Sequence, residues 1–333
     1  MDVNNDLVTS ELVIKRDKLS PVAAEKRLGP IEILVNNASL FSAFNFSMTL
    51  SPKTITVFLD ASPAGEKRAA HAASLAQRWR AHLVGIHAVF SGVVLPASMC
   101  WARGDEALRQ VVDYERHLDS NAEATASQVG EHFRVLCNDL KVSGEFRPIG
   151  REDTVYEAIR IALHSDLVVV GHPEPNGLPD DLSIDKLLLE SSAPLLILPT
   201  AWKGKTIGNK ILIGWNETRE ARRAVADAMP FLVAAESVTV LVIDPDEGCH
   251  QHSDNRGSDL AICVRRYGAT IDLDQVASRG HSISTVLLGY AEQSASDLLV
   301  VGAYSHPRLK EVLLGGTTRT LLEKTSMPTL MSR

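Results

Sequence analysis

Residues 297–302 read DLLVVG, and residues 166–171 read DLVVVG. The two stretches lie 131 residues apart (297 − 166 = 131), and each has an aspartate, four apolar residues and a glycine. Short apolar runs rich in β-branched residues are typical of strands buried inside a parallel sheet. Their recurrence indicates an internal repeat, and such a repeat decides the architecture of the chain.

Two further blocks recur in the same order: SAPLLILP (192–199) with SMPTLMSR (326–333), and TITVFLD (54–60) with KILIGWN (210–216). In the earlier block Asp60 falls opposite Asn216, at an offset of 156 residues (216 − 60 = 156). The two offsets differ by 25 (156 − 131 = 25), so the first copy holds about 25 extra residues. We place them in the amphipathic stretch 91–135.

The second copy alternates short apolar runs with longer amphipathic segments. We expect strands at 211–215, 238–244, 269–276, 297–303 and 328–331, and helices at 218–234, 256–268, 282–295 and 316–325. This alternation predicts an α/β chain of two tandem doubly wound domains, each a parallel sheet covered by helices on both faces. Their expected bounds are 52–200 and 208–333. Ligands in such sheets bind at the carboxyl ends of the strands, here after Trp215, Ile243 and Gly302.

Composition disfavours several classes of protein. The 333-residue chain is 45% hydrophobic with a net charge of −7, which disfavours a general nucleic-acid binder. Its four cysteines form no C-x-x-C pair or other metal-binding spacing. The apolar runs are far shorter than the roughly 20 residues of a membrane helix. We therefore expect a cytoplasmic protein with no bound metal and no nucleic-acid or membrane partner.

The order of elements and the loop after residue 302 resemble the universal stress protein family in its tandem two-domain form, over residues 52–333. That family has an adenine-nucleotide alpha hydrolase-like sandwich fold. Its nucleotide-binding members carry Gly-x-x-Gly, nine residues and Gly-Ser/Thr after the fourth strand. The corresponding positions here are Gly302, Ser305, Gly315, Gly316 and Thr317. The resemblance implies that these residues contact the phosphates of ATP or a related adenine nucleotide.

The family's first strand usually ends in an aspartate that contacts the adenine-ribose part. Asp60 fits this pattern in the first copy, and Asn216 stands there in the second. The resemblance implies that Asn216 contacts the ribose or base. It also implies that LLILP and PTLM pair the two copies into an intramolecular pseudo-dimer, and a homodimer of the chain is compatible with it.

The residues themselves allow two interpretations of the loop 302–319. Glycines let successive backbone N–H groups converge on one anion, and the helix that begins near Gly316 adds unpaired N–H donors. Alternatively, Gly302 only leaves the strand and Thr317 only caps the helix. In the first copy, prolines and acidic residues at 173–181 disfavour a phosphate site. We interpret that copy as non-binding, with Asp60 retained as a helix cap.

The N-terminal residues carry a different resemblance. ILVNNAS (33–39) is similar to a segment of short-chain dehydrogenases, but only 35 residues precede Asn36, and no tyrosine is followed four residues later by lysine. The cofactor loop and catalytic pair of those enzymes are therefore missing. We interpret residues 1–47 as a weakly ordered or non-native extension before Met48.

These observations favour a regulatory binding module of the stress response over an enzyme. We nominate no catalytic residue, although weak ATP hydrolysis is compatible with the predicted site. A nucleotide-free stress-response interaction protein is the alternative. A short-chain reductase ranks third, because its machinery is incomplete.

Overall fold

The computed structural model describes residues 51–88, 105–150, 154–173, 175–245, 257–303 and 316–333. The chain divides into two units, Met1–Ser51 and Pro52–Arg333, and the described elements all belong to the second. The predicted extension 1–47 lies outside the described residues. Two repeats follow, which we call repeat one (52–200) and repeat two (208–333).

Repeat one alternates strands with helices. Its strands are β1 (Thr54–Leu59), β2 (His82–Ala88), β3 (Gly144–Ile149), β4 (Leu167–His172) and β5 (Leu195–Pro199). Its helices are α5 (Pro63–Trp79), α7 (Asp105–Leu140), α8 (Thr154–Ala162) and α9 (Ile184–Ser191).

Repeat two follows the same order, close to the ranges that the sequence predicts. Its strands are β6 (Lys210–Trp215), β7 (Ser237–Ile243), β8 (Ile271–Val276), β9 (Leu298–Gly302) and β10 (Thr329–Ser332). Its helices are α10 (Arg219–Leu232), α11 (Ser258–Arg265), α12 (Ile283–Gln293) and α13 (Gly316–Lys324).

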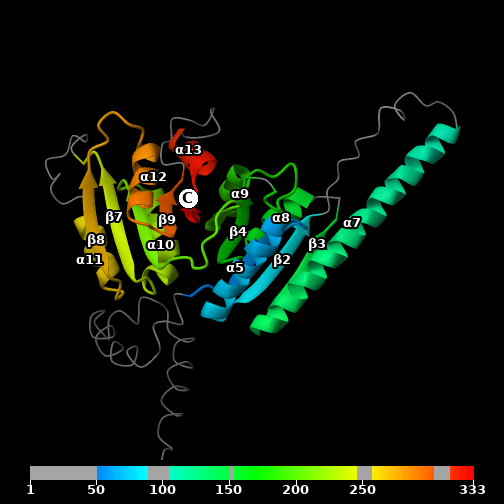
Figure 1. Ribbon diagram of the computed structural model, residues 1–333, viewed down its shortest axis with the longest axis horizontal. Helices are drawn as coiled ribbons and strands as arrows, with labels where there is room; N and C mark the ends of the chain where they lie inside the picture. Colours follow the sequence, from blue (N-terminus) through cyan, green and yellow to red (C-terminus); the bar gives the residue numbers. More distant parts are fainter. Residues whose placement is uncertain (1–50, 89–104, 151–153, 174, 246–256, 304–315) are drawn as a thin grey trace, which may run out of the picture. The chain divides into compact units, whose positions relative to one another are not determined.

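In the described part of the chain, ten strands form one sheet in the order β3-β2-β1-β4-β5-β10-β9-β6-β7-β8 (Figure 1). All pairings inside a repeat are parallel. Right-handed crossovers then place α5 and α7 on one face of repeat one, and α8 and α9 on the other. The contacts of α5 with α7 and of α8 with α9 agree with this arrangement. The predicted doubly wound α/β fold is confirmed.

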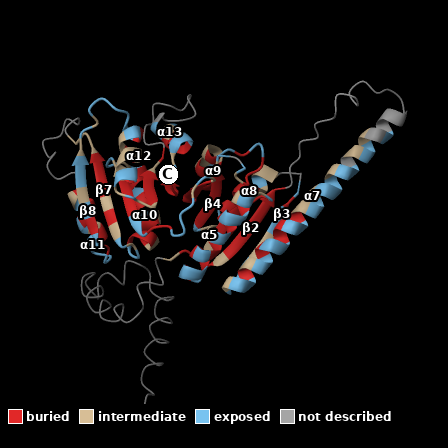
Figure 2. Cartoon of the chain, viewed as in Figure 1, coloured by how far each residue is buried: buried red, intermediate tan, exposed pale blue. Residues whose placement is uncertain are grey.

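The two repeats join through their last strands. β5 pairs antiparallel with β10, with Leu196 opposite Leu330, as the resemblance implies. On one face, the Trp79 ring of α5 and the Phe231 ring of α10 pack nearly perpendicular to each other, with ring centroids 4.7 Å apart. On the other face, a single cluster of buried side chains runs from α8 and α9 to α12 and α13. Figure 2 shows the buried residues gathered on the strands and on the inward sides of the helices.

Serine or threonine side chains cap the N-termini of four of the described helices. The residue before each helix has extended backbone, and its hydroxyl accepts a hydrogen bond from a backbone N–H three residues later, which satisfies a donor that the helix leaves unpaired. These caps are Ser62 for α5, Ser183 for α9, Thr218 for α10 and Ser282 for α12. Ser62 and Thr218 are 156 residues apart, which confirms the alignment of α5 with α10 (218 − 62 = 156).

The aspartates at the start of DLVVVG (166–171) and DLLVVG (297–302) have a structural role. The Asp166 carboxylate accepts hydrogen bonds from the backbone N–H groups of Lys53 and Thr54, at 2.7 and 2.9 Å. The Asp297 carboxylate accepts three such bonds, from Gly208, Asn209 and Lys210, at 2.9–3.1 Å. Each aspartate therefore fixes the entry of the chain into the first strand of its repeat.

The repeats differ most in the helix after their second strand. α7 has 36 residues and α11 has eight, so repeat one carries its extra length largely in this helix. Among the α7 side chains that the structure describes, those before Ala126 are exposed or half-buried, and buried positions begin there (Figure 2). Among the described side chains of α7, those that pack on repeat one therefore lie in its second half.

Candidate functional site

The carboxyl ends of β6 and β9 meet at one edge of repeat two. These strands are parallel neighbours, with Gly214 opposite Val301, so Asn216 and Gly302 come together as predicted. α13 begins at Gly316, and Thr317 in its first turn is exposed. Ser305 and Gly315 lie outside the described residues.

Gly302 has a packing role that the sequence did not indicate. A Cβ atom added to Gly302 would lie 2.3 Å from the Ala221 backbone nitrogen and 2.4 Å from the Glu220 carbonyl carbon. These atoms belong to the first turn of α10, so only a glycine lets the end of β9 and this helix approach so closely. The glycine is thus explained by packing alone, and a ligand is not needed to account for it.

Asn216 is exposed and follows β6 directly. The Thr218 hydroxyl donates a 2.8 Å hydrogen bond to its Oδ1 atom. The same hydroxyl accepts the Ala221 backbone N–H at 3.2 Å as the cap of α10. The position of the Asn216 amide is therefore tied to the start of α10.

Asp244 follows β7, the strand beside β6, and has a left-handed backbone conformation with φ of 51°. Its Oδ1 atom accepts the Ser278 backbone N–H at 2.7 Å. This bond, together with one from the Ser278 side chain, lowers the pKa of the Asp244 carboxyl. The loop after Ile243, one of the three predicted strand-end loops, therefore places a negative charge at the same edge of the sheet.

In repeat one the corresponding edge is filled by an arginine. Arg68 of α5 is 2% exposed and pairs with Asp60, which is 9% exposed. The Arg68 Nε atom donates to the Phe58 carbonyl oxygen at 2.6 Å, and the Arg68 Nη2 atom donates to Asp60 Oδ2. Burial lowers the pKa of Arg68 and Asp60 opposes that effect, so the guanidinium stays charged.

Two glycines make room for this guanidinium. A Cβ atom on Gly171 would lie 2.2 Å from Arg68 Nη1, and one on Gly177 would lie 2.8 Å from Nη2. Gly177 also has φ of +81°, which disfavours any residue with a side chain. In repeat two the position of Arg68 is held by Ala224 (68 + 156 = 224), which is buried. The strand-end site of repeat one is therefore filled from within, and that of repeat two is not filled in this way.

The interpretation of Asp60 as a helix cap is wrong. The cap of α5 is Ser62, whose hydroxyl accepts the Gly65 N–H at 3.1 Å. Asp60 instead accepts the Ser62 N–H at 2.8 Å and binds Arg68. The Asp60 carboxylate is therefore occupied by a side chain of its own repeat.

Two kinds of feature are absent from the described residues. None of their helices has an apolar stretch long enough to cross a membrane. No group of three histidine, cysteine, aspartate or glutamate side chains among them is arranged to hold a metal ion.

Residues 209–333 match the Universal stress protein family. The second repeat belongs to that family. A universal stress protein of Synechocystis sp. is 41% identical over 54 residues, which are 16% of this chain and 18% of that protein. The chain therefore matches less than a fifth of the length of this curated relative.

Solved structures extend the likeness of fold to both repeats. A crystal structure of a universal stress protein from Archaeoglobus fulgidus matches with a TM-score of 0.58 and 12% identity, over 85% of this chain and 96% of that one. One from Pseudomonas aeruginosa matches with a TM-score of 0.50 and 17% identity, over 86% and 95%. At these identities the likeness shows the fold alone. It is the tandem universal stress protein fold that the sequence predicts.

Arg68 and the contacts of Gly177 were not identified from the sequence, for two different reasons. Arg68 stands at helical spacing with Ala72, Leu75 and Trp79, so it falls on the buried face of its helix. That spacing could have revealed it. The contacts of Gly177 could not be found this way, because its partners Phe58 and Arg68 lie more than 100 residues earlier in the chain.

Proposed function

We propose that this universal stress protein is a regulatory binding protein of the stress response, and that repeat two binds ATP or a related adenine nucleotide. The observation that carries the proposal is the difference between Ala224 and Arg68 at matched positions. Repeat one satisfies its strand-end carboxylate with an internal cation. Repeat two has no such cation at the matching position, and its strand ends carry Asn216 and Gly302.

The described residues fit an adenine nucleotide in part. Asn216 offers an amide that can hydrogen-bond a ribose or base, and its position is held by Thr218. Gly316 and Thr317 open α13, where unpaired N–H groups and the helix dipole favour a phosphate. The predicted contacts of Ser305 and Gly315 complete the proposal. Asp244 adds a negative charge nearby, which favours binding of the nucleotide together with Mg²⁺.

Calorimetry of the full-length protein tests this function. Nucleotide is first extracted from the purified protein and identified, and the stripped protein is then titrated with ATP and Mg²⁺. We expect saturable binding that Gly316→Asp weakens at least about tenfold, because the new carboxylate repels phosphate at the helix N-terminus. The same carboxylate is favourable for the helix itself, so the variant is expected to fold.

Gly289→Asp is the matched control. A Cβ atom on Gly289 of α12 would meet nothing within 4 Å, so this change adds the same charge without a clash. Its affinity for ATP should equal that of the unchanged protein. Absence of both extracted nucleotide and binding heat would favour the alternative, a nucleotide-free interaction protein. Equal weakening by both variants would contradict the placement at Gly316.

A further inference from the structure

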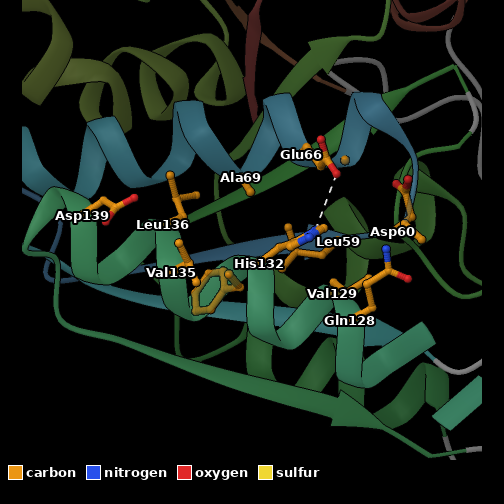
Figure 3. A pocket seen from close by; sticks show the side chains of 13 residues that line it. Leu59, Asp60, Glu66, Ala69, Gln128, Val129, His132, Val135, Leu136 and Asp139 are labelled. Atoms are coloured by element: carbon orange, nitrogen blue, oxygen red, sulfur yellow. Dashed lines mark ion pairs between the residues drawn. The ribbon is translucent and has the colours of Figure 1, made fainter. Parts of the chain in front are cut away.

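Repeat one contains a groove that the strand-end site does not use. It lies between α5 and the second half of α7, starts beside Asp60 at the end of β1, and has a volume of about 360 Å³ (Figure 3). This volume is within the range of about 300–1,000 Å³ that is usual for small-molecule sites. The groove is therefore large enough for a small organic ligand.

The walls of the groove are apolar. They comprise Leu59 of β1, Ala69 of α5, and Val129, Phe133 and Leu136 of α7. Phe133 is fixed in place, because its ring lies against Gly85 of β2, where a Cβ atom would come within 2.8 Å of Cε2. The groove therefore has a preformed apolar floor, which favours a ligand with an apolar body.

The polar side chains of the groove are three carboxylates, Asp60, Glu66 and Asp139, together with Gln128 and His132. Glu66 faces His132 across the groove, with Glu66 Oε1 3.6 Å from His132 Nδ1 (Figure 3). Asp139 lines the groove about two helical turns further along α7. Both members of the Glu66–His132 pair are more than half exposed, so water screens their attraction and a ligand can compete for Glu66. Asp60 is already satisfied by Arg68.

Repeat two provides an internal comparison. The position of Glu66 is held there by Arg222 (66 + 156 = 222), and α11, the counterpart of α7, has only eight residues. Both the Glu66 carboxylate and the long helical wall are thus particular to repeat one. A site that depends on them has no copy in repeat two.

We propose that the α5–α7 groove binds a small organic cation with an apolar body, such as an aromatic or aliphatic amine. The apolar part lies on Phe133 and Val129, and the ammonium group pairs with the carboxylate of Glu66, while Asp139 adds negative charge further along the groove. An anion of the same shape would meet those two carboxylates and be excluded. This site is independent of the nucleotide site proposed for repeat two.

The test compares three probes of one shape with the full-length protein by ligand-observed NMR titration: phenethylammonium, phenethyl alcohol and hydrocinnamate. We expect phenethylammonium to bind saturably, the alcohol about fivefold more weakly, and hydrocinnamate not at all. Equal affinity for the three probes, or no binding of phenethylammonium, would overturn the proposal.

Variants assign any binding to the groove. Glu66→Gln should weaken phenethylammonium about fivefold and leave the alcohol unchanged. Glu131→Gln is the matched control, because Glu131 lies next to His132 on α7 but pairs with Arg134 and does not line the groove. Ala69→Leu should block both probes by filling the groove, and circular dichroism checks that it folds. If Glu131→Gln acts as strongly as Glu66→Gln, or Ala69→Leu folds and still binds, the assignment is wrong.

Discussion

Repeat one and repeat two have the same strand order, but the carboxyl ends of their strands are packed differently. In repeat one a buried guanidinium joins the end of β1 to the loop after β4, through Asp60 and the Phe58 and Pro175 carbonyl groups. In repeat two Ala224 replaces Arg68, and the first turn of α10 lies directly on Gly302. The strand-end region of this fold can thus be filled from within by one long cationic side chain and the glycines that accommodate it.

The largest expected effect tests this internal structure. Arg68→Ala should lower the free energy of unfolding by about 3–5 kcal/mol, because it leaves the Asp60 carboxylate buried without its cation. Urea denaturation followed by circular dichroism measures the change. The double variant Asp60→Ala, Arg68→Ala should lose less than the sum of the two single variants, since it removes both charges together. Strict additivity would mean that the pair does not act as a unit.

A second comparison concerns the two aspartates that open β4 and β9. Asp297→Ala should cost about 2–3 kcal/mol and Asp166→Ala about 1.5–2 kcal/mol, because Asp297 accepts three backbone N–H groups and Asp166 accepts two. Urea denaturation gives both values. Asp227→Ala, which removes only an ion pair with the exposed Arg223, is the control and should cost less than about 1 kcal/mol. The reverse order of the two aspartates would contradict this account.

The smallest effect distinguishes the outer edges of the sheet. Tyr290 of α12 donates a hydrogen bond to Asp274 of β8. The matching position of repeat one, 131 residues earlier, is held by Ile159, which has no hydroxyl group to donate. Burial, followed by the hydrogen bond and charge of Asp274, raises the pKa of Tyr290 to about 12. An unfolded tyrosine has a pKa of about 10, so the stability from this group is complete below pH of about 10 and is lost as the pH rises toward 12.

Phenolate absorbance against pH measures this shift. One of the five tyrosines should ionise near pH 12, and Tyr290→Phe should remove that late step. If the late step persists in Tyr290→Phe, another tyrosine is responsible and the Asp274 contact does not control the titration.

Much of the architecture could be predicted from the sequence, because it depends on local patterns. Apolar runs such as LLVVG predicted the strands. The difference in offset between the repeats predicted the extra length that lies largely in α7. The meeting of Asn216 and Gly302 followed from the general rule for strand ends in doubly wound sheets. These inferences needed only spacing along the chain.

The remaining features depend on contacts between distant segments. The pairing of Arg68 with Asp60 requires the space that Gly171 and Gly177 leave, and a glycine in the sequence does not reveal which atoms approach it. The groove depends on how far α7 lies from α5, which residue periodicity does not define. Packing across the fold decides both features.

Both copies of the domain lie in one polypeptide, and they pair through β5 and β10. In an assembly of two identical chains, a substitution in the gene changes both partners at once. Here Arg68 and Ala224 are encoded separately, so one half can lose a feature while the other keeps it. Because the halves are covalently joined, dilution does not separate them, and their one-to-one ratio does not depend on how much protein the cell makes.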